Sequence, residues 1–140
     1  SLYDRKVLKE DMESACVKLA LDPAVLGSKV QTYSKGMRQK LGLIATILTG
    51  CKILILDEPM SGLDPLARSL VKDFLGAVKA EGRTVILSSH ILADMDEICD
   101  CVTVIDSSKT QFTGTPQAMK LQSDEKYLEK AFLKIIRKAA

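Results

Sequence analysis

Apolar residues recur along the chain in two patterns, which predict helices alternating with short strands. Helical spacing occupies the first twenty residues, and it returns after Ser34, after Asp64 and near the C-terminus. Continuous apolar runs between these segments predict strands at 53–56, 84–87 and 102–106. Strands that alternate with helices favour an α/β layered fold with a mostly parallel sheet, covered on both faces.

The predicted helices have defined ends. Ser34 can cap the second helix and Gly50 can end it, while Asp64 with Pro65 begins the third helix. We also expect a connector at 21–32, a short helix at 91–100 and a hairpin partner for the third strand at 110–114. The apolar positions expected to face the core are Leu8, Met12, Ala15, Cys16 and Leu19 in the first helix, Leu41, Ile44, Ile47 and Leu48 in the second, Leu66, Leu70, Phe74 and Val78 in the third, and Leu128, Ala131, Phe132, Ile135 and Ile136 in the last.

Composition places the chain among ordinary globular proteins. It has 140 residues, 46% hydrophobic and 27% charged, with a net charge of +2. Aromatic residues make up only 4% and tryptophan is absent, so we expect no nucleic-acid partner. The four cysteines do not have zinc-site spacing, and they are typical of reduced thiols in the cytoplasm. The longest uncharged stretch, Leu41 to Cys51, is too short to span a membrane.

Acidic residues directly follow the first buried strand. Asp57 and Glu58 stand at its carboxyl end, where ligands sit in open α/β sheets, and His90 follows the next strand. One carboxylate can serve Mg²⁺ while the next orients or deprotonates an attacking water. Pro59 is expected to give Glu58 an extended backbone. A polar strand exit, with a structural histidine, is the alternative interpretation.

The start of the second predicted helix is a candidate anion site. Ser34 and Gly36 stand where free backbone N–H groups and the positive end of the helix dipole favour a phosphate. The segment Ser61–Pro65 adds a tight acidic loop shortly after Asp57 and Glu58. These features together predict a nucleotide-phosphate site at one edge of the sheet.

The order YSKGMRQ, ILILDEP, SGLDP and SSH resembles the ATP-binding cassette of ABC transporters over nearly the whole chain. YSKGM resembles the signature motif, ILILDE the Walker B motif, SGLDP the D-loop and SSH the switch histidine. The resemblance implies a P-loop NTPase-like fold with ATP and Mg²⁺ as cofactors. Its implied parts are a helical subdomain with the signature helix at 1–50, core strands at 51–106, and a C-terminal hairpin and helix at 107–140.

The same resemblance implies residue roles. Asp57 would serve magnesium, Glu58 would be the general base, and His90 would sense the γ-phosphate. Asp64 would communicate across a dimer of two cassettes. The residues implied to contact nucleotide in the signature segment are Tyr33, Ser34, Lys35, Gly36, Met37 and Gln39.

Two departures from the commonest signature stand out. Lys35 replaces a glycine and Met37 replaces a glutamine. A methionine at this place resembles the branch that serves exporters of drugs, peptides or lipids. The implied partners are therefore a second cassette, in a head-to-tail dimer, and a membrane-spanning permease. The implied location is the cytoplasm, at the inner face of the membrane.

The phosphate-binding loop is missing from this sequence. None of the eight glycines begins a G-x-x-x-x-G-K-[ST] motif. In the resembled family that loop precedes the helical subdomain, so we expect this chain to be the C-terminal part of one cassette. Alone it should be inactive, with exposed apolar surface and open strand edges that promote self-association or docking to another chain. The alternatives are a non-transport ABC protein, acting in translation or DNA maintenance, and a non-catalytic interaction module.

Overall fold

The computed structural model describes residues 6–139, which belong to two compact units. The first unit, which ends at Ser89, contains α1 (Lys9–Lys18), two 3₁₀ turns (Pro23–Gly27 and Val30–Thr32), α2 (Lys35–Leu48), β1 (Ile53–Leu56), α3 (Pro65–Ala80) and β2 (Thr84–Leu87). The second, from His90, contains α4 (Leu92–Ile98), β3 (Val102–Asp106), β4 (Lys109–Gly114), α5 (Pro116–Ser123) and α6 (Leu128–Ala139). The helix–strand alternation expected from the pattern is confirmed. The three-part division at 50 and 106 stays a prediction.

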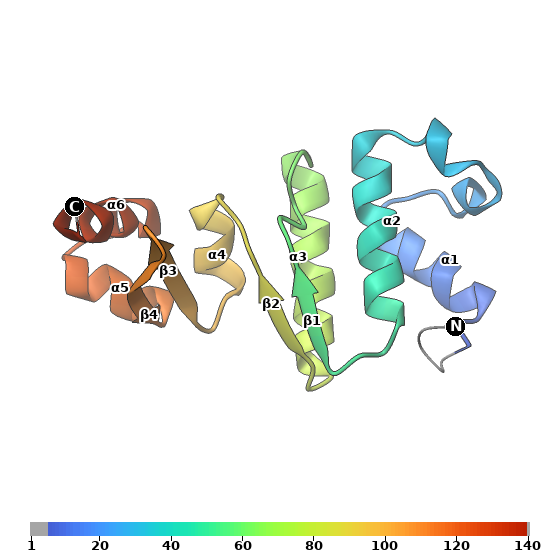
Figure 1. The fold of residues 1–140 in the computed structure, drawn as a ribbon. Coiled ribbons are helices and arrows are strands. Elements are labelled where there is room, and N and C mark those ends of the chain that lie inside the picture. Colours follow the sequence, from blue (N-terminus) through green and yellow to red (C-terminus); the bar gives the residue numbers. More distant parts are fainter. Residues whose placement is uncertain (1–5, 140) are drawn as a thin grey trace. The chain divides into compact units, whose positions relative to one another are not determined.

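A parallel strand pair lies at the centre of the first unit. β1 and β2 run in register from Ile53 beside Thr84 to Leu56 beside Leu87, and α3 connects them. Figure 1 shows α3 alongside the two strands. Because the strands are parallel and in register, the residues that follow Leu56 and Leu87 emerge at the same edge of the sheet.

The apolar run of β1 is typical of a strand covered on both faces, but within this chain only one face is covered, and the other has the exposed apolar surface predicted for an incomplete cassette. Leu54 and Leu56 are buried, but Ile53 is 60% exposed and Ile55 is 76% exposed. Ile86 on β2 is 53% exposed as well. Alternate strand residues point to opposite faces, so one face packs on helices while the other lies open. No described residue of the first unit covers this apolar face.

The helices bury slightly different residues from those predicted. In α2 the buried side chains are Leu43, Ile44 and Ile47, whereas Leu41 and Leu48 are only half-buried. In α3 the expected core position Leu66 is 70% exposed, which corrects that prediction. Steps of four residues drift around a helix that has 3.6 residues per turn. The buried stripe of α3 therefore mixes steps of three and four, through Ala67, Val71, Phe74, Leu75 and Val78.

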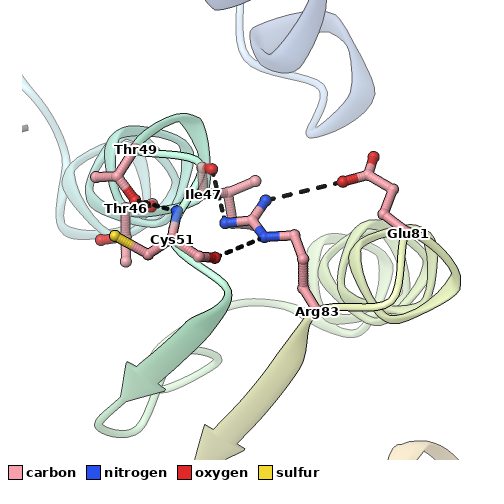
Figure 2. A network of polar contacts seen from close by, with 6 residues as sticks. All are labelled: Thr46, Ile47, Thr49, Cys51, Glu81 and Arg83. Carbon is pink, nitrogen blue, oxygen red and sulfur yellow. Dashed lines mark hydrogen bonds and ion pairs between the residues drawn. The ribbon is translucent and has the colours of Figure 1, made fainter. Parts of the chain in front are cut away.

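Arg83 joins the C-terminal end of α2 to the start of β2 (Figure 2). Its Nε donates to the Cys51 carbonyl at 2.9 Å and its Nη2 to the Ile47 carbonyl at 3.0 Å. A cation at the C-terminal end of a helix also interacts favourably with the negative end of the helix dipole. The ion pair with Glu81, at 3.8 Å between Nη1 and Oε2, involves a largely exposed carboxylate and contributes little.

The second unit contains the predicted hairpin and terminal helix. β3 and β4 pair antiparallel, with Asp106 beside Lys109. The intervening Ser107 and Ser108 have φ of 48° and 61°, and a type I′ hairpin turn requires positive φ at both of these positions. α5 was not predicted, although Thr115 caps it and Pro116 stands at its first position. Among residues 6–139, the structure has no helix long and apolar enough to cross a membrane.

Candidate functional site

Asp57 and Ser88 meet at the carboxyl edge of the parallel strands. The Ser88 amide donates to the Leu56 carbonyl at 3.0 Å, which continues the strand pairing by one residue. The Ser88 hydroxyl donates to Asp57 Oδ1 and accepts from the Glu58 amide at 3.0 Å. A single hydroxyl therefore orders both acidic residues that follow β1.

The Glu58 backbone is left-handed, with φ of 47°, and this corrects the extended conformation expected before Pro59. The conformation is fixed by its hydrogen bonds. In addition to the Ser88 contact, the Glu58 carbonyl accepts from the Ser61 amide and from Gln39 Nε2, each at 3.0 Å. These contacts from three segments outweigh the local preference that the proline imposes.

The N-terminal end of α2 has the features of an anion site. Ser34 caps the helix, its hydroxyl accepting from the Met37 amide at 3.1 Å. Ser34 and Lys35 are exposed, and the first turn of α2 contains no acidic residue. The first N–H groups of a helix have no partner within the helix, so this end can receive a phosphate oxygen.

The start of α2 packs against residues 57–64, which we call the acid loop. Gly62 has φ of 73°, and a Cβ there would lie 3.2 Å from Cε of Lys35. A Cβ on Gly36 would lie 3.5 Å from the Leu63 side chain. The structure therefore brings the signature-like segment and the acid loop together, although 20 or more residues separate their glycines in the sequence.

Asp64 begins α3 at the end of the acid loop. Its Oδ1 accepts from the Ala67 amide at 2.9 Å, and this hydrogen bond lowers the pKa of the Asp64 carboxyl, with a smaller contribution from Lys40 on α2. The carboxylate is exposed and ionised at neutral pH. Its communication across a dimer stays a prediction.

Other residues of the signature-like segment have contacts within the chain. Tyr33 is 5% exposed, and its hydroxyl donates to the Val25 carbonyl in the connector. Arg38 Nη1 donates to the Tyr33 carbonyl. Gln39 binds the acid loop through Glu58. The nucleotide contacts implied for Tyr33, Met37 and Gln39 stay predictions.

His90 is the first residue of the second unit, and it follows Ser88 and Ser89 in the sequence. Its closeness to Glu58 and its role with a phosphate stay predictions. The residues brought together within the first unit are therefore Asp57, Glu58, Ser88, Gln39 and the start of α2.

The acids fit a magnesium ion that is bound mainly by substrate. No group of three metal-binding side chains exists among the residues described, so there is no closed metal cage in this part of the chain. Asp57 supplies one exposed carboxylate at the strand edge. Mg²⁺ in nucleotide enzymes keeps several waters and takes one or two carboxylates with the phosphates, so a single acid is compatible with it.

Sequence reasoning missed the role of Ser88 and the partner of Gln39. The place of Ser88 beside Asp57 could be predicted from the sequence, because Ser88 directly follows β2 just as Asp57 directly follows β1. The Gln39 contact joins a helix to a loop and has no sequence signal of its own.

Comparisons with known proteins identify the family of the chain. Residues 25–96 match the family model described as "AAA domain, putative AbiEii toxin, Type IV TA system". The chain is 34% identical over 135 residues to the uncharacterized ABC transporter ATP-binding protein YdbJ of Bacillus subtilis, covering 94% of this chain and 41% of that protein. It is 37% identical over 107 residues to the fluoroquinolones export ATP-binding protein Rv2688c of Mycobacterium tuberculosis, covering 76% of this chain and 35% of that protein.

A third relative and a solved structure extend the comparison. The ABC transporter ATP-binding protein sll0415 of Synechocystis is 38% identical over 99 residues, covering 71% of this chain and 28% of that protein. A structure titled as the ATP binding subunit of an ABC transporter superposes with a TM-score of 0.71 and 26% identity, covering 97% of this chain and 65% of that chain. The chain thus spans 28% to 41% of the length of these three relatives.

Proposed function

Because the chain belongs to the family of ABC transporter ATP-binding proteins, we propose that it forms part of the ATP-hydrolysing subunit of an export-type ABC transporter. The observation that supports this best is the packing of the α2 start against the acid loop. This packing lies in the same unit as Ser34, Asp57 and Glu58, the residues to which the proposal gives phosphate binding, magnesium binding and base catalysis.

The proposed roles follow from the chemistry of each group. Asp57, oriented by the Ser88 hydroxyl, holds the magnesium ion of MgATP. When bound, the magnesium ion would neutralise negative charge on the phosphates. Glu58 accepts a proton from the attacking water as general base. For His90 the proposed role is the one that the resemblance implies, sensing of the γ-phosphate.

The opposite edge of the proposed site comes from a second cassette. Ser34 and the amides near Gly36 bind the γ-phosphate held by the opposing subunit, and Asp64 communicates between the two sites. An exposed, positively polarised helix end suits a ligand that is supplied by another chain. The cassette pair sits in the cytoplasm against a membrane-spanning permease, which it drives.

Export is the proposed direction of transport. Met37 stands where the resembled exporters carry methionine, and Rv2688c is named as a fluoroquinolones export protein.

The proposal requires a phosphate cradle from outside these 140 residues. Reading the coding sequence upstream of Ser1 in the native gene tests this requirement. We expect an in-frame G-x-x-x-x-G-K-[ST], and we expect the longer product to bind MgATP far more tightly than the 140-residue chain. A stop codon directly upstream would overturn the ATPase assignment and favour a module that only binds other cassettes.

A further inference from the structure

The backbone of Glu58 has an unusual conformation for a residue other than glycine. Positive φ is uncommon outside glycine because Cβ then approaches the backbone oxygen, and Glu58 has a φ of 47°. Such conformations cost free energy and persist only where the surroundings impose them. The surroundings that impose this one are therefore of functional interest.

Two side chains hold the backbone of Glu58, one at its amide and the other at its carbonyl. Ser88 Oγ accepts from the Glu58 amide at 3.0 Å, and Gln39 Nε2 donates to the Glu58 carbonyl at 3.0 Å. Ser88 lies 30 positions after Glu58 and Gln39 lies 19 positions before it, so each contact depends on the tertiary fold. We call these two contacts the Glu58 clamp.

The clamp determines where the Glu58 side chain leaves the backbone. In the left-handed conformation the Cα–Cβ bond points in a different direction from that of an extended strand residue. Asp57, which continues β1, and Glu58 therefore diverge, and one can hold a cation while the other faces a water. A small change in the Glu58 φ would swing its carboxylate by more than the tolerance of a proton transfer.

We propose that Gln39 and Ser88 are positioning residues for the general base, which they serve by fixing the left-handed Glu58 backbone. This role rests on the proposed function, because it assumes that Glu58 acts on water. Gln39 belongs to α2, whose first turn faces the proposed phosphate of the opposing subunit. The clamp therefore also ties that helix directly to the base of its own subunit.

The first test measures the backbone of Glu58 in the isotope-labelled 140-residue chain. The amide–Hα coupling and the Cα and Cβ chemical shifts of Glu58 report its φ. Gln39→Met removes the amide donor at similar length, and Ser88→Ala removes the hydroxyl. We expect both variants to move the Glu58 signals toward extended values, Ser88→Thr to restore them, and the exposed control Gln122→Met to leave them unchanged.

The second test measures steady-state ATP hydrolysis by the full-length gene product with the same substitutions. We expect kcat to fall roughly tenfold to hundredfold in Gln39→Met and Ser88→Ala, with little change in KM, and to recover in Ser88→Thr. Circular dichroism checks that each variant folds. If Gln39→Met does not fold, Ser88→Ala alone tests the positioning role. Unchanged Glu58 signals, or unchanged kcat in a folded variant, would overturn the positioning role. A wild-type protein without ATPase activity would instead overturn the proposed function, and this role with it.

Discussion

The side-chain amide of Gln39 on α2 donates a hydrogen bond to the Glu58 carbonyl, with 3.0 Å between Nε2 and O. The contact joins the signature-like helix to the acids after β1. With Lys35 lying against Gly62 and Leu63 against Gly36, it makes the start of α2 and the acid loop one structural unit. A shift of either segment must therefore affect the other.

Replacing Glu58 by glycine should be less destabilising than replacing it by alanine. Both variants lose the carboxylate, but only alanine keeps a Cβ at a φ of 47°. We expect Glu58→Gly to be more stable than Glu58→Ala by about 1 kcal/mol in urea unfolding. At Asp73, exposed within α3, the order should reverse by about the same amount. A Glu58→Ala variant at least as stable as Glu58→Gly would contradict the left-handed assignment.

Arg83 should stabilise the first unit through the carbonyls that it binds. Its side chain is 12% exposed and donates to Cys51 and Ile47. We expect Arg83→Met to lower the free energy of unfolding by about 2–4 kcal/mol, because two part-buried carbonyls lose hydrogen bonds from a charged donor. Arg83→Lys should recover part of the loss. Glu81→Gln is the control and should stay within about 0.5 kcal/mol of wild type; an equal loss would mean that the ion pair matters instead.

The stabilisation that the Asp64 N-cap of α3 gives to the fold should depend on pH. The Ala67 amide lowers the pKa of the Asp64 carboxyl in the folded chain, so the ionised form stabilises the fold at pH above the ordinary value of 3.8. That stabilisation is lost as pH falls through the lowered pKa. Unfolding midpoints of wild type and Asp64→Ala, compared from about pH 7 to about pH 2, should therefore converge on acidification.

Thr115 provides the control for this pH dependence. It caps α5 by accepting from the Ala118 amide at 3.0 Å, and it has no carboxyl to titrate. The midpoint difference between wild type and Thr115→Ala should not converge over the same acidic range. Equal convergence at both caps would assign the effect to the whole protein and not to Asp64.

The open face of β1 should make the isolated chain associate. Ile53, Ile55 and Ile86 together expose apolar surface on the strand pair. We expect Ile55→Thr to reduce self-association in sedimentation velocity while changing stability by less than about 1 kcal/mol. Leu54→Ala, on the buried face, should instead cost about 2–5 kcal/mol. A monodisperse wild-type chain would contradict the predicted association.

The sequence was informative where local chemistry decides the structure. Ser34 and Asp64 cap their helices as predicted, and the apolar run at 53–56 is a strand. It failed where tertiary contacts decide. The residue types around Glu58 do not indicate a left-handed backbone, because two of the three contacts that hold it, those of Gln39 and Ser88, come from distant parts of the sequence. Whether a face of β1 is exposed depends on which other segments pack on it, and the apolar pattern of β1 alone does not show this.

The site divides in the same way. The place of Asp57 and Glu58 after a strand predicts them as site residues, whereas the contact of Ser88 with Asp57 is evident only from the strand register of the structure. Gln39 was assigned to nucleotide by resemblance, and the structure adds a contact to Glu58 that spacing alone cannot predict, since it depends on how α2 packs on the acid loop.

The most direct measurement is the rate of MgATP hydrolysis by the full-length gene product, with bound nucleotide measured in the same samples. Glu58→Gln should lower the rate at least about a hundredfold while ATP stays bound, because the amide keeps the shape of the side chain but accepts no proton. Glu129→Gln, an exposed position on α6, should behave as wild type. Hydrolysis by Glu58→Gln at the wild-type rate would contradict the account.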